Sequence, residues 1–142
     1  MVVSNTELVE NAVIEALKIQ FPDFDVESFP VDFKQYTFTS PLGCFLVRFL
    51  SNDFSEQTTI WEVNQNQTMH FSITSIYRGL GRYSEAYYPQ QVLRDTIQGL
   101  EVLGRKIVLE NEQFLTEIDT DLYFGLKCKI QLYEDEESEA GV

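Results

Sequence analysis

The chain has 142 residues, 44% hydrophobic and 13% aromatic, which suffices for one domain with a buried core but not for two. Its formal net charge of -13 argues against a nucleic-acid binder, because Lys and Arg side chains supply the affinity for phosphates. The same negative charge argues against binding to an anionic membrane surface. No apolar run approaches the ~20 residues that a membrane span needs, and no leader sequence is apparent, so a soluble protein is expected.

The N-terminal segment predicts a helix. Ser4 and Glu7 fit a capping box, and Phe21-Pro22 stops the pattern. Residues 26–29 and 33–39 predict short extended pieces, and residues 40–43 predict a turn. The helical spacing is carried by six apolar residues: Leu8, Val9, Ala12, Val13, Ala16 and Leu17.

Extended structure follows. Residues 44–50, CFLVRFL, predict a central strand covered on both faces, and residues 51–57 predict a polar loop. Residues 58–63 and 67–77 predict the arms of a β-hairpin around Asn64-Gln65-Asn66, since both are rich in β-branched and aromatic residues. The second arm alternates Met69, Phe71 and Ile73 with His70, Ser72 and Thr74.

A second helix is predicted from Pro89, with Gly104 as its C-terminal cap and an apolar stripe of Val92, Leu93, Ile97, Leu100 and Leu103. Residues 105–109 predict a short strand. Residues 122–133 predict an antiparallel strand with one solvated face, because apolar and polar side chains alternate along them. This order predicts an α+β fold, a largely antiparallel sheet with two helices packed on one face.

Residues 1–133 are expected to form this single domain. Residues 134–142, EDEESEAGV, differ from them in composition and carry five acids: Glu134, Asp135, Glu136, Glu137 and Glu139. A run of like charges usually stays solvated, so we expect a disordered acidic tail. The alternative is that these residues form a docking tail, which binds to another surface.

Residues suited to catalysis are few. The sole histidine, His70, lies in mid-strand and is expected to be a surface histidine rather than a catalytic base. Cys44 and Cys128 fall within strand-like alternation and are expected to be reduced core cysteines. Glu117, Asp119 and Asp121 lack the spacing of a calcium loop and are expected to be solvated loop acids. We therefore expect no catalytic residue, no metal and no cofactor.

Residues 76–89, IYRGLGRYSEAYYP, join the predicted hairpin to the second helix. The Gly79-Leu80-Gly81 run lacks the third glycine and the βαβ frame of a dinucleotide-binding loop, so the glycines are expected to form a turn with positive φ. Tyrosine and arginine are enriched at protein interfaces. The segment therefore predicts a contact surface made of Tyr77, Arg78, Arg82, Tyr83, Tyr87 and Tyr88, unless its tyrosines fold back over the helix as the edge of the core.

The order of elements carries a resemblance. TELVENAVIEALKIQFPDFDVESFP, then SPLGCFLVRFL, the aromatic hairpin, PQQVLRDTIQGLEVLG and LYFGLKCKIQLYE resemble the tail terminator (tail completion) family of Mu-like contractile-tailed phages and prophages. The resemblance covers roughly residues 6–134 and depends on pattern and spacing rather than on a diagnostic motif. The acidic residues 134–142 depart from the pattern of the family.

The resemblance implies a structural virion protein and no enzyme. Such proteins form a ring, by analogy a hexamer, on the head-proximal end of the tail tube. The ring stops polymerisation of the tube and joins the tail to the head, so the implied partners are further copies of the chain, the tail tube protein, the sheath and the neck or connector proteins. The implied location is the neck of the virion, with the host cytoplasm during assembly, and carboxylates facing the lumen would repel passing DNA.

Two other classes of function remain open from the sequence. An acidic DNA-mimic inhibitor would carry carboxylates arrayed on a folded surface, whereas the densest acidic cluster here lies in residues 134–142. A small hydrolase or ligand-binding α+β domain would need a pocket with converging polar groups. A measurement of the mass of the protein in solution would distinguish a ring from both of these alternatives.

Overall fold

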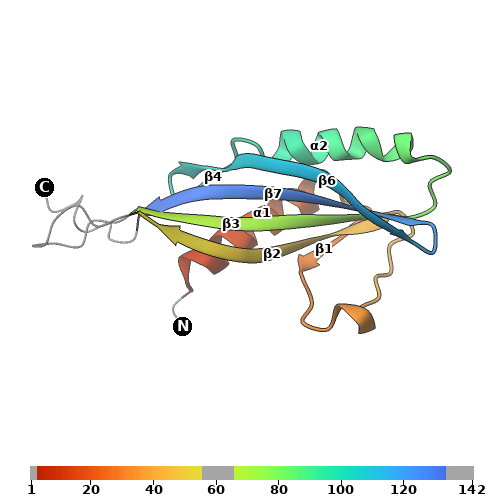
Figure 1. Ribbon diagram of the computed structural model, residues 1–142, viewed down its shortest axis with the longest axis horizontal. Helices are drawn as coiled ribbons and strands as arrows, with labels where there is room; N and C mark the ends of the chain where they lie inside the picture. The colour runs from red at the N-terminus through yellow and green to blue at the C-terminus, as the bar shows by residue number, and fades with distance from the viewer. Residues whose placement is uncertain (1–2, 56–65, 134–142) are drawn as a thin grey trace, which may run out of the picture.

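The computed structural model describes residues 3–55 and 66–133 (Figure 1). Its main sheet has five strands in the order β1-β2-β3-β7-β6. The strands are β1 (Asp25–Ser28), β2 (Gly43–Phe54), β3 (Asn66–Tyr77), β6 (Val108–Ile118) and β7 (Asp121–Tyr133). Only the β1–β2 pair is parallel, and each other neighbouring pair is antiparallel.

Two α-helices cover one face of this sheet, α1 (Asn5–Gln20) and α2 (Tyr87–Ile97). The predicted cap of α1 is present, since the Ser4 hydroxyl accepts a hydrogen bond from the Glu7 N–H at 3.1 Å. Figure 1 shows α1 behind the central strands and α2 along β6. The predicted α+β class, with two helices on one face of a largely antiparallel sheet, is confirmed.

The core lies between the helices and this face of the sheet. Val9, Val13 and Leu17 of α1 and Leu93 and Ile97 of α2 are fully buried. They pack against the helix-facing side chains of the three central strands: Phe45, Val47, Met69, Phe71, Ile73, Leu126, Cys128 and Ile130. The alternation predicted for residues 67–77 and 122–133 is confirmed, because each strand buries one set of side chains.

The predicted hairpin is wrong in its pairing. Strand β3, the predicted second arm, pairs along its length with β2 on one side and with β7 on the other. The predicted first arm is residues 58–63. Those residues lie outside the described part of the chain. The predicted loop over residues 51–57 is also wrong where it is described, since β2 continues to Phe54 and passes a β-bulge at Leu50.

The second helix ends earlier than predicted. It stops at Ile97, and Gly99 adopts φ +79° just beyond its end, where a left-handed residue is favoured. Leu103 and Gly104 instead form the turn between two short strands, β4 (Glu101–Val102) and β5 (Arg105–Lys106). Gly104 is therefore not the helix cap.

A β-hairpin replaces the polar loop that the sequence predicts around Asp119. Strands β6 and β7 are joined by Asp119 and Thr120, whose φ angles are +50° and +69°. The predicted strand over residues 105–109 is split into β5 and the start of β6. Glu117 and Asp121 are strand residues, so the prediction of loop acids holds for Asp119 alone.

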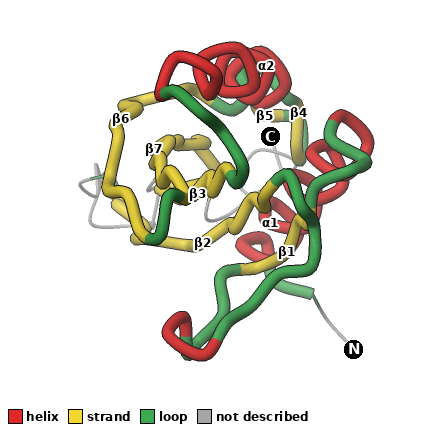
Figure 2. The backbone as a smooth tube through the Cα atoms, turned by 90° about the vertical axis from the view of Figure 1, so that its right-hand side faces the viewer, coloured by secondary structure: helices red, strands yellow, loops and turns green. Residues whose placement is uncertain are grey.

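The segment 29–39, here called the aromatic arm, projects from the body after β1 (Figures 1 and 2). It contains a short 3-10 helix, Phe33–Gln35, and not the predicted extended piece. Its rings stack in series, with centroids 5.1 Å apart for Phe29–Phe33, 6.3 Å for Phe33–Tyr36 and 6.2 Å for Tyr36–Phe38. The arm covers Cys44, Leu46 and Ile76 on the helix-free face, so β2 is buried on both sides there.

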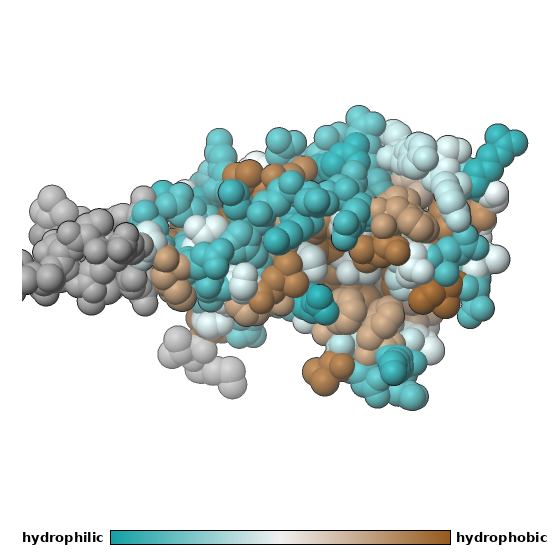
Figure 3. Space-filling model, viewed as in Figure 1, coloured by the Kyte–Doolittle hydropathy of each residue, from teal (hydrophilic) through white to brown (hydrophobic). Residues whose placement is uncertain are grey.

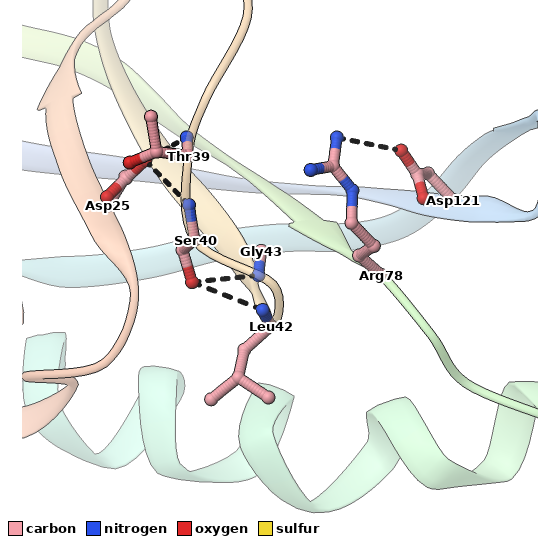
Figure 4. Close-up of polar contacts among 7 residues, drawn as sticks. All are labelled: Asp25, Thr39, Ser40, Leu42, Gly43, Arg78 and Asp121. Atoms are coloured by element: carbon pink, nitrogen blue, oxygen red, sulfur yellow. Dashed lines mark hydrogen bonds and ion pairs between the residues drawn. The ribbon is translucent and has the colours of Figure 1, made fainter.

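Gly43 marks a close approach at the start of β2. Its φ is +142°, and a Cβ atom there would lie 1.9 Å from the carbonyl oxygen of Ile76. The turn before it is held by Asp25, whose carboxylate accepts hydrogen bonds from the N–H groups of Thr39 at 2.8 Å and Ser40 at 3.2 Å (Figure 4). This network fixes where the aromatic arm returns to the sheet.

Candidate interaction surface

Residues 76–89 leave β3 and enter α2 through a turn and a 3-10 helix, Tyr83–Ala86. Gly79 has φ +79°, as the sequence predicts, whereas Gly81 does not adopt positive φ. The Gly81 N–H donates to a carboxylate oxygen of Glu85 at 3.1 Å, which closes the turn from within. The segment therefore holds its own shape, and its side chains divide between the core and the surface.

Tyr77 belongs to the core. Its side chain is 2% exposed, and its hydroxyl donates to Oε1 of the equally buried Gln90 at 2.5 Å. The Gln90 amide donates to Glu112 at 2.7 Å, and Arg94 pairs with the other oxygen of Glu112 at 2.7 Å. Burial raises the pKa of Tyr77 well above its usual range. A residue in this position is not available to a neighbouring protein.

Arg78 fixes the aromatic arm to the sheet. Its guanidinium lies 3.8 Å from the centre of the Phe38 ring and 3.5 Å from a carboxylate oxygen of Asp121 (Figure 4). Its side chain is 40% exposed, so the ion pair is partly screened by water. Both contacts join segments far apart in the sequence, which gives Arg78 a structural role whether or not it also meets a partner.

Tyr83, Tyr87 and Tyr88 are exposed, with relative exposures of 51%, 62% and 75%. The Tyr83 hydroxyl donates to Glu117 at 2.6 Å, and this hydrogen bond raises the pKa of Tyr83. The Tyr83 ring lies 5.4 Å from that of Phe114, which is also exposed. Arg82, directly before the 3-10 helix, is exposed as well.

A groove of about 250 Å³ lies beside these rings. Tyr87 and Phe114 line it, together with Gln90, Arg94, Glu112, Gln113 and Phe124. We call Tyr83, Tyr87 and Phe114 the tyrosine surface. Its exposed aromatic rings are of a kind enriched at protein interfaces, and the Arg94–Glu112 ion pair lies beside them in the groove.

Strand β6 extends the tyrosine surface along an edge of the sheet. Phe114, Leu115 and Ile118 are exposed, and the outer edge of β6 pairs with no other strand in the described ranges. β-Bulges at Glu110 and Leu115 interrupt its ladder with β7. Beyond the start of β6, which falls in the predicted strand over residues 105–109, the sign of this strand in the sequence is the apolar cluster of Phe114, Leu115 and Ile118 in a polar stretch.

His70 has partners that the sequence does not reveal. Its Nε2 lies 2.8 Å from Asp53 of β2, and its Nδ1 lies 2.7 Å from Glu110 of β6. Glu110 is the bulged residue of β6, and the bulge lets its side chain reach across β7 to β3. Because both ring nitrogens are engaged by carboxylates and the side chain is 14% exposed, His70 ties three strands together.

The cysteines are poorly placed to act as nucleophiles. Cys44 and Cys128 are both free and buried, and burial raises the pKa of each thiol to about 12. The thiolate is the reactive form of cysteine, so both side chains are held in the unreactive form at neutral pH. The prediction of reduced core cysteines agrees with this placement.

The described residues also lack an arrangement suited to a metal. Within residues 3–55 and 66–133, no group of three or more His, Cys, Asp or Glu side chains is placed to hold a metal ion. Neither of the described α-helices has the length and apolar run required to cross a bilayer.

The structure divides the six residues of the predicted contact surface. Tyr83, Tyr87 and Tyr88 are exposed with Arg82, Arg78 is half-exposed and engaged, and Tyr77 is buried. One tyrosine of the segment thus folds into the core and three do not. Whether the exposed residues meet a partner stays a prediction.

Comparison with known proteins identifies a family and a shared fold. The family model described as Gp37 protein matches residues 13–140 of the chain. Among solved structures, a chain from the "Virion of native gene transfer agent (GTA) particle" superposes with a TM-score of 0.55 and 12% sequence identity, over 93% of this chain and 99% of that chain. At this identity the likeness shows the fold. No curated protein sequence matches the chain.

Proposed function

The chain belongs to the Gp37 protein family, and we propose that it is a structural protein of a phage-like virion that caps the tail tube as a ring. The observation that carries the proposal is the fold shared with a chain of the gene transfer agent virion, over 93% of this chain and 99% of that one. A fold alone does not assign a function. The tube-capping role is proposed from the resemblance to tail terminators. It requires exposed surfaces on the chain that are suited to contacts between subunits of a ring.

A closed ring needs two different adhesive surfaces on each subunit, because heterologous contacts repeat by rotation. The tyrosine surface includes Phe114 of the edge strand β6, whereas β1 is the opposite edge strand, and the aromatic arm that follows it covers part of the helix-free face. Val31, within the aromatic arm, is fully exposed. Figure 3 shows apolar side chains where the arm meets the sheet, and further apolar groups between polar side chains over the rest of this face. The two edges of the sheet therefore differ in shape and in the side chains that they expose.

The ring contact is proposed to use side chains rather than strand addition. An edge strand that is free to pair with another chain is usually flat and uncharged, whereas bulges and charges oppose pairing. Strand β6 has two bulges and carries Glu110, Glu112 and Glu117. The exposed rings beside it are the better anchors, so Tyr83 and Tyr87 are expected to carry most of the contact.

The test compares the native chain with Tyr83→Ala, Tyr87→Ala and Arg82→Glu variants. Each is mixed with the tail tube protein of the same particle, and rings and capped tubes are counted by electron microscopy, with mass measured by light scattering. We expect the variants to lose capped tubes about tenfold or more, as for the loss of an interface anchor. Their thermal melts should match that of the native chain.

The control is Ile19→Ala, which removes another exposed apolar side chain from α1. It should leave capping unchanged. A native chain that stays monomeric and does not bind the tube protein would remove the support for a tube cap. A collapsed melt in the tyrosine variants would instead show that these residues are part of the packing. Neighbouring tube and sheath genes would support the assignment, and the sheath and neck proteins are the remaining proposed partners.

A further inference from the structure

Basic side chains converge on one pocket of this acidic chain. A pocket of about 320 Å³ lies among strands β3, β5, β6 and β7, lined by Thr68, Arg105, Lys106, Val108, Lys129 and Gln131. Three of the ten Lys and Arg residues of the chain are among these, and none of the lining residues within 3–55 and 66–133 is an Asp or Glu. The pocket is therefore suited to an anion.

Acids on the strands beside the two lysines are engaged elsewhere or lie on a strand outside the pocket lining. Asp53 and Glu110 are both engaged with His70, the cross-strand neighbour of Lys129. Glu101 is the cross-strand partner of Lys106 in the β4–β5 pair, on a strand that does not line the pocket. Lys106 and Lys129 therefore make the pocket a site where further negative charge is favoured.

We propose that the acidic segment 134–142 of the same chain binds in this pocket. Strand β7 ends at Tyr133, four residues beyond Lys129, which corresponds to about 13 Å along a strand. Nine residues can reach up to about 30 Å when extended, so the segment is long enough to turn back to the pocket. It carries five carboxylates toward a basic lining. The proposal does not depend on the tube-capping role.

A tether makes such a contact effective although each ion pair is weak. Exposed ion pairs contribute little one by one, so the free segment is expected to bind with a Kd of about a millimolar or weaker. A short linker holds its ligand at an effective concentration of about a millimolar. The segment would thus occupy the pocket for a substantial share of the time and compete there with other anions.

The test uses the whole chain and amide NMR shifts. In the neutral-tail variant, Glu134, Glu136, Glu137 and Glu139 become Gln and Asp135 becomes Asn. We expect the amides of Thr68, Lys106 and Lys129 to shift between the native and neutral-tail chains at about 0.05 M NaCl, and the difference to vanish at about 0.5 M. Adding the peptide EDEESEAGV to the neutral-tail chain should restore the native shifts at millimolar concentration.

A matched pair of variants identifies the site. Lys106→Gln with Lys129→Gln should abolish the shift difference, whereas Lys18→Gln with Lys34→Gln, two exposed lysines elsewhere, should leave it intact. Equal shifts in the native and neutral-tail chains would overturn the proposal. A difference that grows with protein concentration together with the mass of the particle would also overturn it, since the segment of another copy would then be bound.

Discussion

At the scale of single residues, tyrosines from one segment have opposite environments. Tyr77 is buried and hydrogen-bonded to the buried Gln90, whereas Tyr83 is half-exposed and hydrogen-bonded to Glu117 on the surface. The amino-acid composition of the segment does not distinguish the two tyrosines. Removing a buried hydroxyl leaves its hydrogen-bond partner without a donor, whereas water replaces a hydroxyl that is lost from the surface. Substitution of each tyrosine by phenylalanine is therefore expected to have different effects on stability.

We expect Tyr77→Phe to lower the free energy of unfolding by about 1–2 kcal/mol, because Oε1 of Gln90 would be left buried without a donor. Tyr83→Phe should leave the free energy of unfolding unchanged within the error of measurement, because water replaces the lost hydroxyl at the surface. Urea denaturation followed by circular dichroism measures both. Equal losses would mean that the two hydroxyls share one environment, contrary to the structure.

The two thiols give a prediction that depends on pH. Burial raises the pKa of Cys44 and of Cys128 from 9.0 to about 12. Since the folded-state values lie above the unfolded one, the stability contributed by the protonated thiols is fully present below about pH 9 and is lost as the pH rises toward 12. Thiolates are the reactive form, so neither cysteine should react with iodoacetamide at pH 8 in the native chain.

Labelling followed by mass spectrometry checks this prediction. The native chain should carry no label, and the chain in denaturant should carry two, one for each cysteine. Rapid labelling of the native chain would show that at least one thiol is accessible. Stability measured between pH 7 and pH 11 should stay level at first and then fall.

At the scale of elements, the sequence predicts best those that bury a regular face. Helix α1 and strand β7 each present apolar residues at a regular spacing, and the structure buries Val9, Val13 and Leu17 of α1 and the apolar face of β7, whereas Leu8 is exposed. Strand β6 escapes prediction beyond its first two residues because it lies at the edge and is exposed along most of its length, so its stability comes from pairing with β7 rather than from a buried stripe. The end of α2 is misplaced by the sequence because Leu103 continues the helical spacing by coincidence.

The candidate surface is predictable only in part for the same reason. The composition of residues 76–89 points to Tyr87 and Tyr88, which are exposed, but Phe114 reaches the surface through a strand that no periodicity predicts. The contact between His70 and Glu110 also requires the β6 bulge. Contacts between distant segments become visible once the strand order is known.

The β6–β7 turn contains a residue poorly suited to its backbone. Thr120 is β-branched and has φ +69°, a left-handed conformation that favours glycine or asparagine. We expect Thr120→Gly to raise the free energy of unfolding by about 0.5–1 kcal/mol, since relief of strain exceeds the extra entropy of the unfolded chain.

Thr116→Gly is the control, because Thr116 lies within β6 at a position without positive φ. It should lower the free energy of unfolding by about 0.5–1 kcal/mol, as glycine does inside a strand. Thermal melts of the two variants beside the native chain provide the measurement. A lower melting temperature for Thr120→Gly would mean that the threonine makes a contact worth more than the strain.

At the scale of the whole molecule, charge has opposite effects on the two proposed interactions: it opposes association of copies in a ring and favours binding of residues 134–142 to the basic pocket. Every copy carries a formal charge of -13, so bringing copies together in a ring is opposed by repulsion that salt reduces. Binding of residues 134–142 to the basic pocket is an attraction that salt weakens. The two proposals therefore predict salt dependences of opposite sign in one protein.

We expect self-association of the native chain to strengthen as NaCl rises from about 0.05 M to about 0.5 M, because the screening length falls from about 14 Å to about 4 Å. Sedimentation equilibrium measures the association constant at each concentration. The neutral-tail variant removes five of the thirteen net negative charges, so its association should be stronger at low salt and change less with NaCl. Association that weakens with salt would show that ion pairs between subunits outweigh the repulsion, and would place charged residues, rather than the rings of Tyr83 and Tyr87, at the centre of the contact.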